Sequence, residues 1–402
     1  MNLLILRSSF QTDDFVKTEY AELLKRLSNE CHAEITILGD ENLNETQSFA
    51  SQQTDYVMIA TGGVENLFKR LMPSTGQLIA DGRNNSLAAA LEILTYLEGQ
   101  GKEGRIIHGT NDEIIANVKG CDRLFNGTRI GLFGQPSDWL IASGVDRDYL
   151  FAQYGVETMD IDLQRLIDGI KGIPQTDAVK VAQAIVKRSH DTIEPSCSDM
   201  VEAAKAYLAI KQICEEERLN ALTIRCFDIV TRCGTTSCLA LALLNDEGIV
   251  AGCEGDMQTL MSMLLAKRLC GEEAFMANPS QLTDETTMLA HCTLPLQLCD
   301  DLTIRSHFES GIGVAIQGVM PLTDYTLFKW GGPRLDRYFV TEAQAIEAPY
   351  SNHFCRTQIT LNTNLKPYLL QHSIGNHHVL IKGRHAEKIK WAMEELGVRS
   401  EE

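Results

Sequence analysis

The first third of the chain alternates between short apolar runs and longer helical patterns, and this alternation restricts the fold more than any other sequence feature. Runs rich in aliphatic and β-branched residues occupy Asn2–Leu6, Glu34–Leu38, 56–60 and 105–108. Between them, apolar side chains recur at helical spacing in residues 15–31, 64–71 and 86–97. Because strands that alternate with helices form βαβ units, we predict a parallel sheet here.

A second unit of the same kind begins at residues 129–134, which form another short apolar run. The turn 135–137 follows it, and the pattern predicts a helix that starts at Asp138. Further strands are predicted at 155–161, Ala221–Ile224 and 249–252, with helices at 198–218, 235–244 and 257–269. We therefore expect a second α/β domain with a parallel sheet.

From about residue 272 the helical periodicity fades, and short strand-like runs are separated by turns, as in an antiparallel, barrel-like β domain. A final helix is predicted at 385–396. The expected domains are residues 1–125, 126–271 and 272–402, with two α/β units followed by a β-rich one.

The charge balance is acidic, with 36 basic and 54 acidic residues and a formal charge of −18. Such a surface repels nucleic acid and anionic membranes, whereas a neutral sugar or a divalent cation suits it. Residues 1–7 resemble a first strand rather than a signal peptide, and no apolar run reaches the roughly 18 residues of a membrane span. With 12 cysteines and no Cys-x-x-Cys pair, the chain is expected in a reducing cytoplasm.

Two carboxylates follow predicted strands of the middle unit. Asp228 comes just after Ala221–Ile224, and Glu254 just after 249–252. In parallel sheets, ligands bind beyond the carboxyl ends of the strands, so both acids can face one crevice and ligate a metal or act as a general base. The alternative is that Asp228 is a solvated loop acid and Glu254 a helix cap.

Histidines supply the second group of candidates. His377 and His378 are adjacent, and neighbours in a strand point to opposite faces, so at most one is expected in a given pocket. His291 ends another strand-like run. Neutral imidazole is a common metal ligand, although a surface or hydrogen-bonded core histidine is the alternative in each case.

Paired cysteines and clustered glycines form two other patterns. Cys226 and Cys253 each precede one of the carboxylates by one or two residues, as a two-thiol racemase would require, but small buried side chains are the alternative role. The glycines Gly311, Gly313 and Gly318 do not have the spacing of a dinucleotide loop, and no Gly-x-x-x-x-Gly-Lys motif is present.

Taken in order along the chain, several short segments resemble the L-fucose/L-arabinose isomerase superfamily, and above all its shorter fucose-isomerase-like members. These segments are 85–89, 130–139, 225–228, 253–256, 291–293, 355–358 and 375–378. The resemblance implies two doubly wound α/β domains followed by a β-rich domain. It also implies a homo-oligomer, either a trimer or a hexamer.

The activity implied by the resemblance is a metal-dependent isomerisation between an aldose and a ketose, such as L-fucose or D-arabinose, through an enediolate. Carried over residue by residue, Asp228, Glu254 and His378 would bind Mn²⁺ or another divalent cation such as Mg²⁺ or Co²⁺, with His291 as a further candidate. The two acids, Asp228 and Glu254, would also be catalytic.

Substrate hydroxyls would contact His377, Arg356 and Gln358, and a structural role is the alternative for Arg356. The chain is shorter than full L-fucose isomerases, so the resemblance does not specify the sugar. The alternative functions are a non-catalytic sugar-binding protein of the same fold and a metal-independent racemase.

Overall fold

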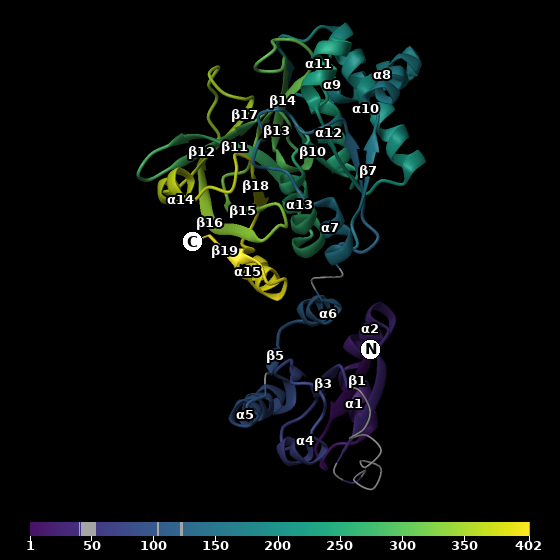
Figure 1. The fold of residues 1–402 in the computed structure, drawn as a ribbon, viewed down its shortest axis with the longest axis vertical. Coiled ribbons are helices and arrows are strands. Elements are labelled where there is room, and N and C mark those ends of the chain that lie inside the picture. Colours follow the sequence, from purple (N-terminus) through teal and green to yellow (C-terminus); the bar gives the residue numbers. More distant parts are fainter. Residues whose placement is uncertain (40, 42–53, 103, 121–123, 402) are drawn as a thin grey trace. The chain divides into compact units, whose positions relative to one another are not determined.

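The computed structural model describes residues 1–39, 41, 54–102, 104–120 and 124–401 (Figure 1). The chain divides into two compact units, Met1–Cys121 and Asp122–Glu402. The predicted boundary at residue 271 falls inside the second unit, which contains both a parallel sheet and a β-barrel. Among the described residues, none of the helices combines the length and the apolar character that crossing a bilayer requires.

The first unit is built on a five-stranded parallel sheet with the order β2-β1-β3-β4-β5. Its strands are β1 (Asn2–Leu6), β2 (Glu34–Leu38), β3 (Tyr56–Ile59), β4 (Gln77–Ile79) and β5 (Arg105–Ile107). Successive side chains of β1 enter two different cores, Leu3 and Ile5 on one face and Leu4 and Leu6 on the other. Helices therefore cover both faces: α1 (Asp13–Glu19), α2 (Ala21–Cys31) and α6 (Asn111–Lys119) on the first, and α4 (Glu65–Leu71) and α5 (Ser86–Gly99) on the second.

The second unit begins with a four-stranded parallel sheet in the order β10-β9-β6-β7. The strands are β6 (Arg129–Phe133), β7 (Glu157–Ile161), β9 (Ala221–Ile224) and β10 (Val250–Cys253). The surrounding helices are α7 (Arg147–Tyr154), α8 (Leu163–Gly172), α9 (Gln175–Arg188), α10 (Cys197–Glu217), α11 (Cys226–Cys233) and α12 (Cys238–Asp246). The prediction of two parallel α/β sheets is thereby confirmed.

The helix predicted from Asp138 is wrong, because residues 138–146 form turns and extended loop and the next helix starts at Arg147. Tertiary contacts satisfy the backbone of this loop. Gln258 donates to the carbonyl oxygens of Ala142 and Gly144, at 3.1 Å each. A local helical pattern cannot anticipate such partners, which come from a distant helix.

Six of the remaining strands form a closed antiparallel barrel in the order β15-β18-β11-β12-β17-β16, closed by the pairing of β16 with β15. Its strands are β11 (Ala274–Leu282), β12 (Thr287–His291), β15 (Asp324–Gly331), β16 (Arg337–Glu347), β17 (Thr357–Leu361) and β18 (His378–Lys382). The barrel-like prediction is confirmed, but the sequence did not predict β11, because Pro279 and a bulge interrupt its apolar pattern.

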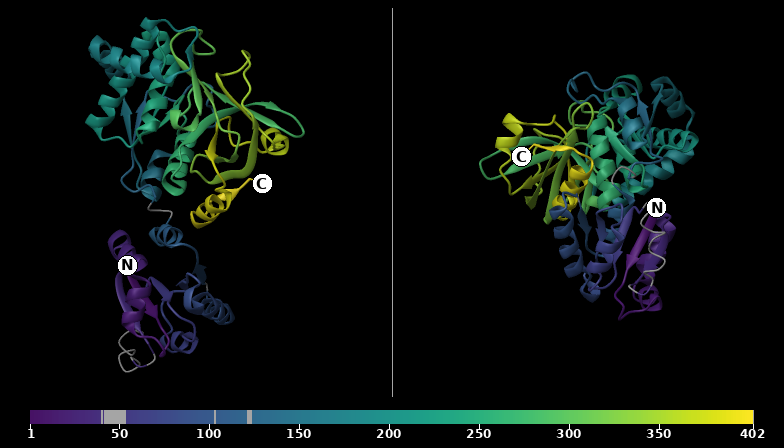
Figure 2. Two further views of the ribbon diagram at one scale, coloured as in Figure 1. Left: turned by 180° about the vertical axis from the view of Figure 1, so that it is seen from behind. Right: turned by 60° about the horizontal axis from the view of Figure 1, so that its bottom comes forward.

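Smaller elements complete the second unit. A three-stranded sheet contains β8 (Asp191–Thr192), β13 (Asp301–Arg305) and β14 (Ala315–Val319), and β19 (Arg399–Ser400) pairs with β16. The helices α14 (Lys366–Gln371) and α15 (Ala386–Glu395) follow the barrel strands β17 and β18. Figure 2 shows the yellow-green barrel strands beside the teal helical layer of the same unit.

Helix α13 (Met257–Leu265) connects the parallel sheet to the barrel. All nine of its residues are buried, and it contacts β9 and β10 on one side and β11, β15 and β18 on the other. Its residues are mostly apolar, and the polar side chains of Gln258, Thr259 and Ser262 make hydrogen bonds inside the protein, as a helix covered on every side requires. Because α13 starts shortly beyond β10, this packing brings the carboxyl end of β10 close to the start of β18.

Candidate functional site

Glu254 stands at the centre of the candidate site, directly after β10. Its backbone is left-handed, with φ 65°, and so is that of Gly255, with φ 76°. The carbonyl oxygen of Glu254 accepts a hydrogen bond from Ser137 N at 2.9 Å, and a Cβ on Gly255 would lie 2.6 Å from Pro136 Cα. A left-handed non-glycine residue costs about 1–3 kcal/mol, and such strain is concentrated at functional sites.

Two histidines approach the same carboxylate oxygen. His291 Nε2, at the end of β12, lies 3.8 Å from Glu254 Oε1, and His377 Nε2, just before β18, lies 3.4 Å from it. Among the described residues, His377 Nε2 is fully buried and makes no hydrogen bond, because its approach to Glu254 has the distance of an ion pair without hydrogen-bond geometry. A buried polar atom without a partner is costly, which marks this position as one intended for a ligand.

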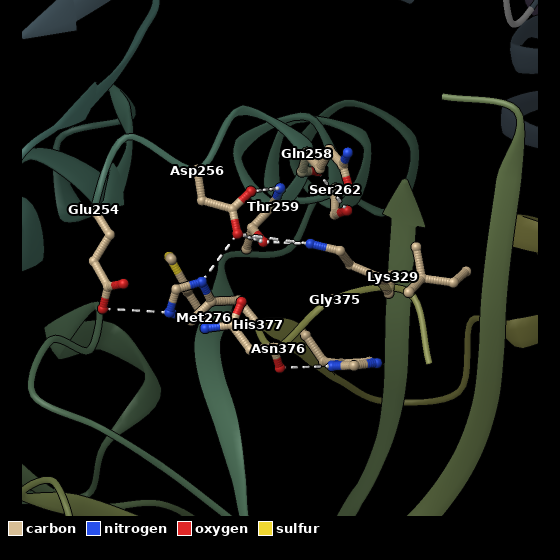
Figure 3. Close-up of polar contacts among 12 residues, drawn as sticks. Glu254, Asp256, Gln258, Thr259, Ser262, Met276, Lys329, Gly375, Asn376 and His377 are labelled. Atoms are coloured by element: carbon tan, nitrogen blue, oxygen red, sulfur yellow. Dashed lines mark hydrogen bonds and ion pairs between the residues drawn. The ribbon is translucent and has the colours of Figure 1, made fainter. Parts of the chain in front are cut away.

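Behind His377 lies a buried polar network (Figure 3). Asp256 Oδ2 accepts a hydrogen bond from His377 Nδ1 at 2.9 Å, and Lys329 Nζ lies 3.7 Å from the same oxygen. Lys329 also donates to Thr259 Oγ1 at 2.7 Å, while Thr259 donates to both oxygens of Asp256. All four side chains are fully buried, so the charges of Asp256 and Lys329 must compensate each other.

Asp256 and Lys329 were not among the site residues predicted from the sequence. Asp256 is the N-cap of α13, and its side chain accepts a hydrogen bond from Thr259 N. Because acids are common at this position of a helix, its place in the sequence gives no sign of a further role. The signal that could have found Lys329 is its place between Phe328 and Trp330 in a continuous apolar strand. A charge in such a run has to be paired inside the core.

Burial and neighbouring charges set the protonation of this cluster. Burial by itself would raise the pKa of Glu254, but His291 and His377 outweigh it and hold the pKa well below the usual range. Burial would likewise raise the pKa of Asp256, and the charge of Lys329 together with His377 lowers it. For His377, burial lowers the pKa, but hydrogen bonds to Asp256 and Glu254 raise it to about 9. The cluster therefore favours a positive charge beside Glu254.

In their neutral forms, which metal binding requires, the two histidines differ in which nitrogen carries the proton. His377 Nδ1 faces the carboxylate of Asp256, so it is the donor and leaves Nε2 to face Glu254. His291 Nδ1 instead accepts from Thr293 N at 3.3 Å, which leaves the ring proton on Nε2, toward Glu254. His377 thus has the orientation that a carboxylate behind the ring gives to metal-binding histidines, whereas His291 directs its Nε2–H toward Glu254 at 3.8 Å without a hydrogen bond.

The structure places His378 and Asp228 outside this cluster. His378 points the other way from His377, and its Nε2 lies 2.8 Å from Tyr368 Oη. Asp228 accepts from Arg225 Nε at 3.1 Å and lines a cavity of about 500 Å³ at the carboxyl ends of β6, β7 and β9. Of the residues predicted as metal ligands, the structure brings together Glu254 and His291, and His377 joins them.

The other predicted substrate residues stabilise nearby loops. Arg356 Nε donates to Ser306 O at 2.8 Å, and Arg356 Nη1 donates to Tyr350 Oη at 3.2 Å. Gln358, on β17, donates to the carbonyl oxygens of Ser351 and Cys355. In this arrangement both side chains are occupied by protein partners.

The donors around Glu254 fit a divalent cation. A carboxylate oxygen and the unpartnered His377 Nε2 face each other, and ligand atoms of Cys253, Glu254 and His291 lie within 4.8 Å of one another. Carboxylate and imidazole are ligands for ions such as Mn²⁺, Co²⁺ and Zn²⁺. A cation here would also supply the positive charge that the carboxylates of Glu254 and Asp256 favour.

The second unit joins a parallel α/β sheet to an antiparallel barrel through a buried helix. An acid–histidine cluster lies at the junction of the two, as in a protein with a metal or catalytic site there. No known protein-family model matches the chain. Curated proteins named sulfoquinovose isomerase are similar to it.

The relative from Alkalicoccus urumqiensis is 24% identical over 65% of this chain and 61% of its own length. The one from Priestia aryabhattai is 22% identical over 77% and 73%, and the one from Clostridium sp. (strain MSTE9) is 26% identical over 73% and 66%. The chain thus spans less than two thirds of the first of these relatives.

Proposed function

We propose that this protein is a divalent-metal-dependent isomerase that interconverts an aldose and a ketose. The observation that carries the proposal is the buried carboxylate of Glu254, which faces two imidazole groups where the sheet meets the barrel. The names of the similar proteins support a sugar as the substrate. Sulfoquinovose therefore joins L-fucose and D-arabinose among the candidate substrates.

The reaction removes a proton from a carbon next to a carbonyl and returns it to the neighbouring carbon. Glu254, whose carboxylate lies at the centre of the cluster, is the base that we assign to this transfer, and general-base catalysis contributes about 10²–10⁴-fold. A divalent cation such as Mn²⁺, Mg²⁺ or Co²⁺, when bound, stabilises the negative charge of the enediolate. Glu254 and His377 are the residues that would hold it.

The other residues of the cluster orient these groups. Asp256 holds the His377 ring through Nδ1, and Lys329 balances the charge of Asp256, so the ring keeps one orientation in the fully buried network. The Nε2–H of His291 points toward Glu254. When a substrate is bound, this group can donate to a substrate oxygen instead of facing Glu254. Asp228 stays a candidate for transfer of a hydroxyl proton.

The experiment is a screen of aldoses with added Mn²⁺, in which ketose formation is followed. The panel contains L-fucose, D-arabinose and sulfoquinovose. Turnover is expected with at least one sugar, and EDTA is expected to stop it until Mn²⁺ is restored. Glu254→Gln should abolish turnover while the far-UV circular dichroism stays unchanged, and Asp228→Asn tests the second acid.

The alternatives give different results. A non-catalytic sugar-binding protein would bind a sugar of the panel but form no ketose. A metal-independent racemase would keep its activity in EDTA and lose it in Cys226→Ser. Cys226 Sγ lies 3.2 Å from Cys253 Sγ, which leaves no space for a substrate carbon between the two thiols and disfavours this alternative. We also propose that the protein is cytoplasmic and forms a homo-oligomer, either a trimer or a hexamer. Analytical ultracentrifugation would test the oligomeric state.

A further inference from the structure

Trp139 has a direct contact with Glu254 that the proposed reaction does not use. Its indole Nε1 donates to Glu254 Oε2 at 2.6 Å, whereas the other oxygen, Oε1, faces the two histidines. A hydrogen bond to a charged acceptor is among the stronger ones in proteins. The indole therefore fixes the rotation of the carboxylate, with one oxygen held and the other directed into the cluster.

The ring of Trp139 is 50% exposed, although tryptophan is usually highly buried. The only polar atom of its side chain is already bonded to Glu254, so the exposed remainder is apolar ring surface. An apolar face in water beside a functional carboxylate costs free energy unless something covers it during function.

Two further aromatic rings, the half-buried Phe227 and the buried His307, support the indole of Trp139. Phe227, on α11, packs edge-to-face against Trp139, with ring centroids 5.0 Å apart and planes at 85°. His307 packs in the same manner against Phe227, at 5.5 Å and 81°. The three rings brace one another, so the position of Trp139 is set by α11 and by the loop after β13. A braced aromatic surface can bind an apolar face at a low entropy cost.

We propose that Trp139 binds the substrate by packing its indole against the apolar C–H face of a monosaccharide, and that its N–H positions Glu254. This inference rests on the proposed function for the identity of the ligand class. Pyranose rings have one face rich in C–H groups, and an amphipathic aromatic side chain with a bonded polar edge is suited to such a face.

Two substitutions separate the two roles. Trp139→Phe keeps an aromatic face and loses the N–H, so kcat should fall about tenfold, as expected for a lost hydrogen bond to a charged group, while KM stays within about twofold. Trp139→Ala loses both, so KM should also rise about tenfold. Trp391→Phe, on α15, is the control and should leave both constants unchanged. If both Trp139 variants behave like the control, the proposal is overturned.

Tryptophan fluorescence tests sugar contact without turnover. L-fucose and sulfoquinovose are added to the Mg²⁺-supplemented protein, and the emission is compared in wild type, Trp139→Phe and Trp391→Phe. The proposal expects a change in wild type and Trp391→Phe that is absent in Trp139→Phe. An equal change in all three proteins, or none with either sugar, would overturn it. A Trp139-dependent change without ketose formation would support the contact and refute the isomerase.

Discussion

Replacing Lys329 by Met tests whether the buried charge pair with Asp256 stabilises the second unit. Lys329 Nζ lies 3.7 Å from Asp256 Oδ2, and both side chains are completely buried. Methionine has a similar length and no charge, so the main change is that the buried carboxylate of Asp256 loses its lysine partner and keeps only His377, which it shares with Glu254. Breaking such a pair by removing one partner costs about 3–5 kcal/mol, a large fraction of the roughly 5–15 kcal/mol that stabilises a typical domain.

Urea unfolding followed by tryptophan fluorescence measures this loss selectively, because Trp139, Trp330 and Trp391 all lie in the second unit. Trp330 is fully buried and adjacent to Lys329, so its emission reports on this part of the core. Lys180→Met is the matched control, since Lys180 is 75% exposed and its pair with Asp177 should contribute less than about 0.5 kcal/mol.

A double variant makes the test sharper. Asp256→Asn added to Lys329→Met removes the stranded charge, while the amide that replaces the carboxylate keeps an oxygen that can accept from Thr259 N. The double variant should be more stable than the sum of the two single losses predicts, because the two residues interact. A loss below about 1 kcal/mol in Lys329→Met, or strict additivity, would refute the argument.

Three more predictions follow from local geometry. Gly255→Ala should lower the free energy of unfolding by about 1–3 kcal/mol in urea titrations, since φ is 76° and a Cβ would lie 2.6 Å from a backbone atom. Tyr368→Phe removes the hydrogen-bond partner of His378 Nε2 and should lower the free energy of unfolding by about 1 kcal/mol. The affinity for Mn²⁺, measured by calorimetry, should stay unchanged, and a loss of affinity would show that His378 binds the metal. Hydrogen bonds from Arg305 lower the pKa of Glu194 from 4.5 to about 2. The ionised Glu194 therefore contributes fully to the free energy of unfolding above pH 4.5, and this contribution, about 1 kcal/mol after screening by solvent, is lost as the pH falls through 2. Glu194→Gln should flatten the dependence of the free energy of unfolding on pH over that range.

The sequence alone predicts most strands of the two parallel sheets and of the barrel, although it did not predict β4 (Gln77–Ile79). The reason is that helical and strand periodicities are local and follow burial directly. Strands such as β1, β2 and β9 were predicted with the bounds that the structure has. Where a residue broke the local pattern, as Pro279 does in β11, prediction failed.

The sequence also indicated Glu254 and His291 as candidates, because an acid after a parallel strand and a histidine at a strand end can be recognised from the sequence pattern. It showed that only one of His377 and His378 could face a given pocket, through the alternation of side chains along a strand. It could not choose between them on that ground, and the family resemblance favoured His378.

Tertiary structure alone decided which side chains meet. The packing of α13 between the sheet and the barrel directs His377 to Glu254 and Asp256, and turns His378 toward Tyr368. It also brings in Lys329 from β15, a strand far from α13 along the chain. These contacts depend on the relative positions of packed elements, and a pattern along the chain contains no information about distances between elements.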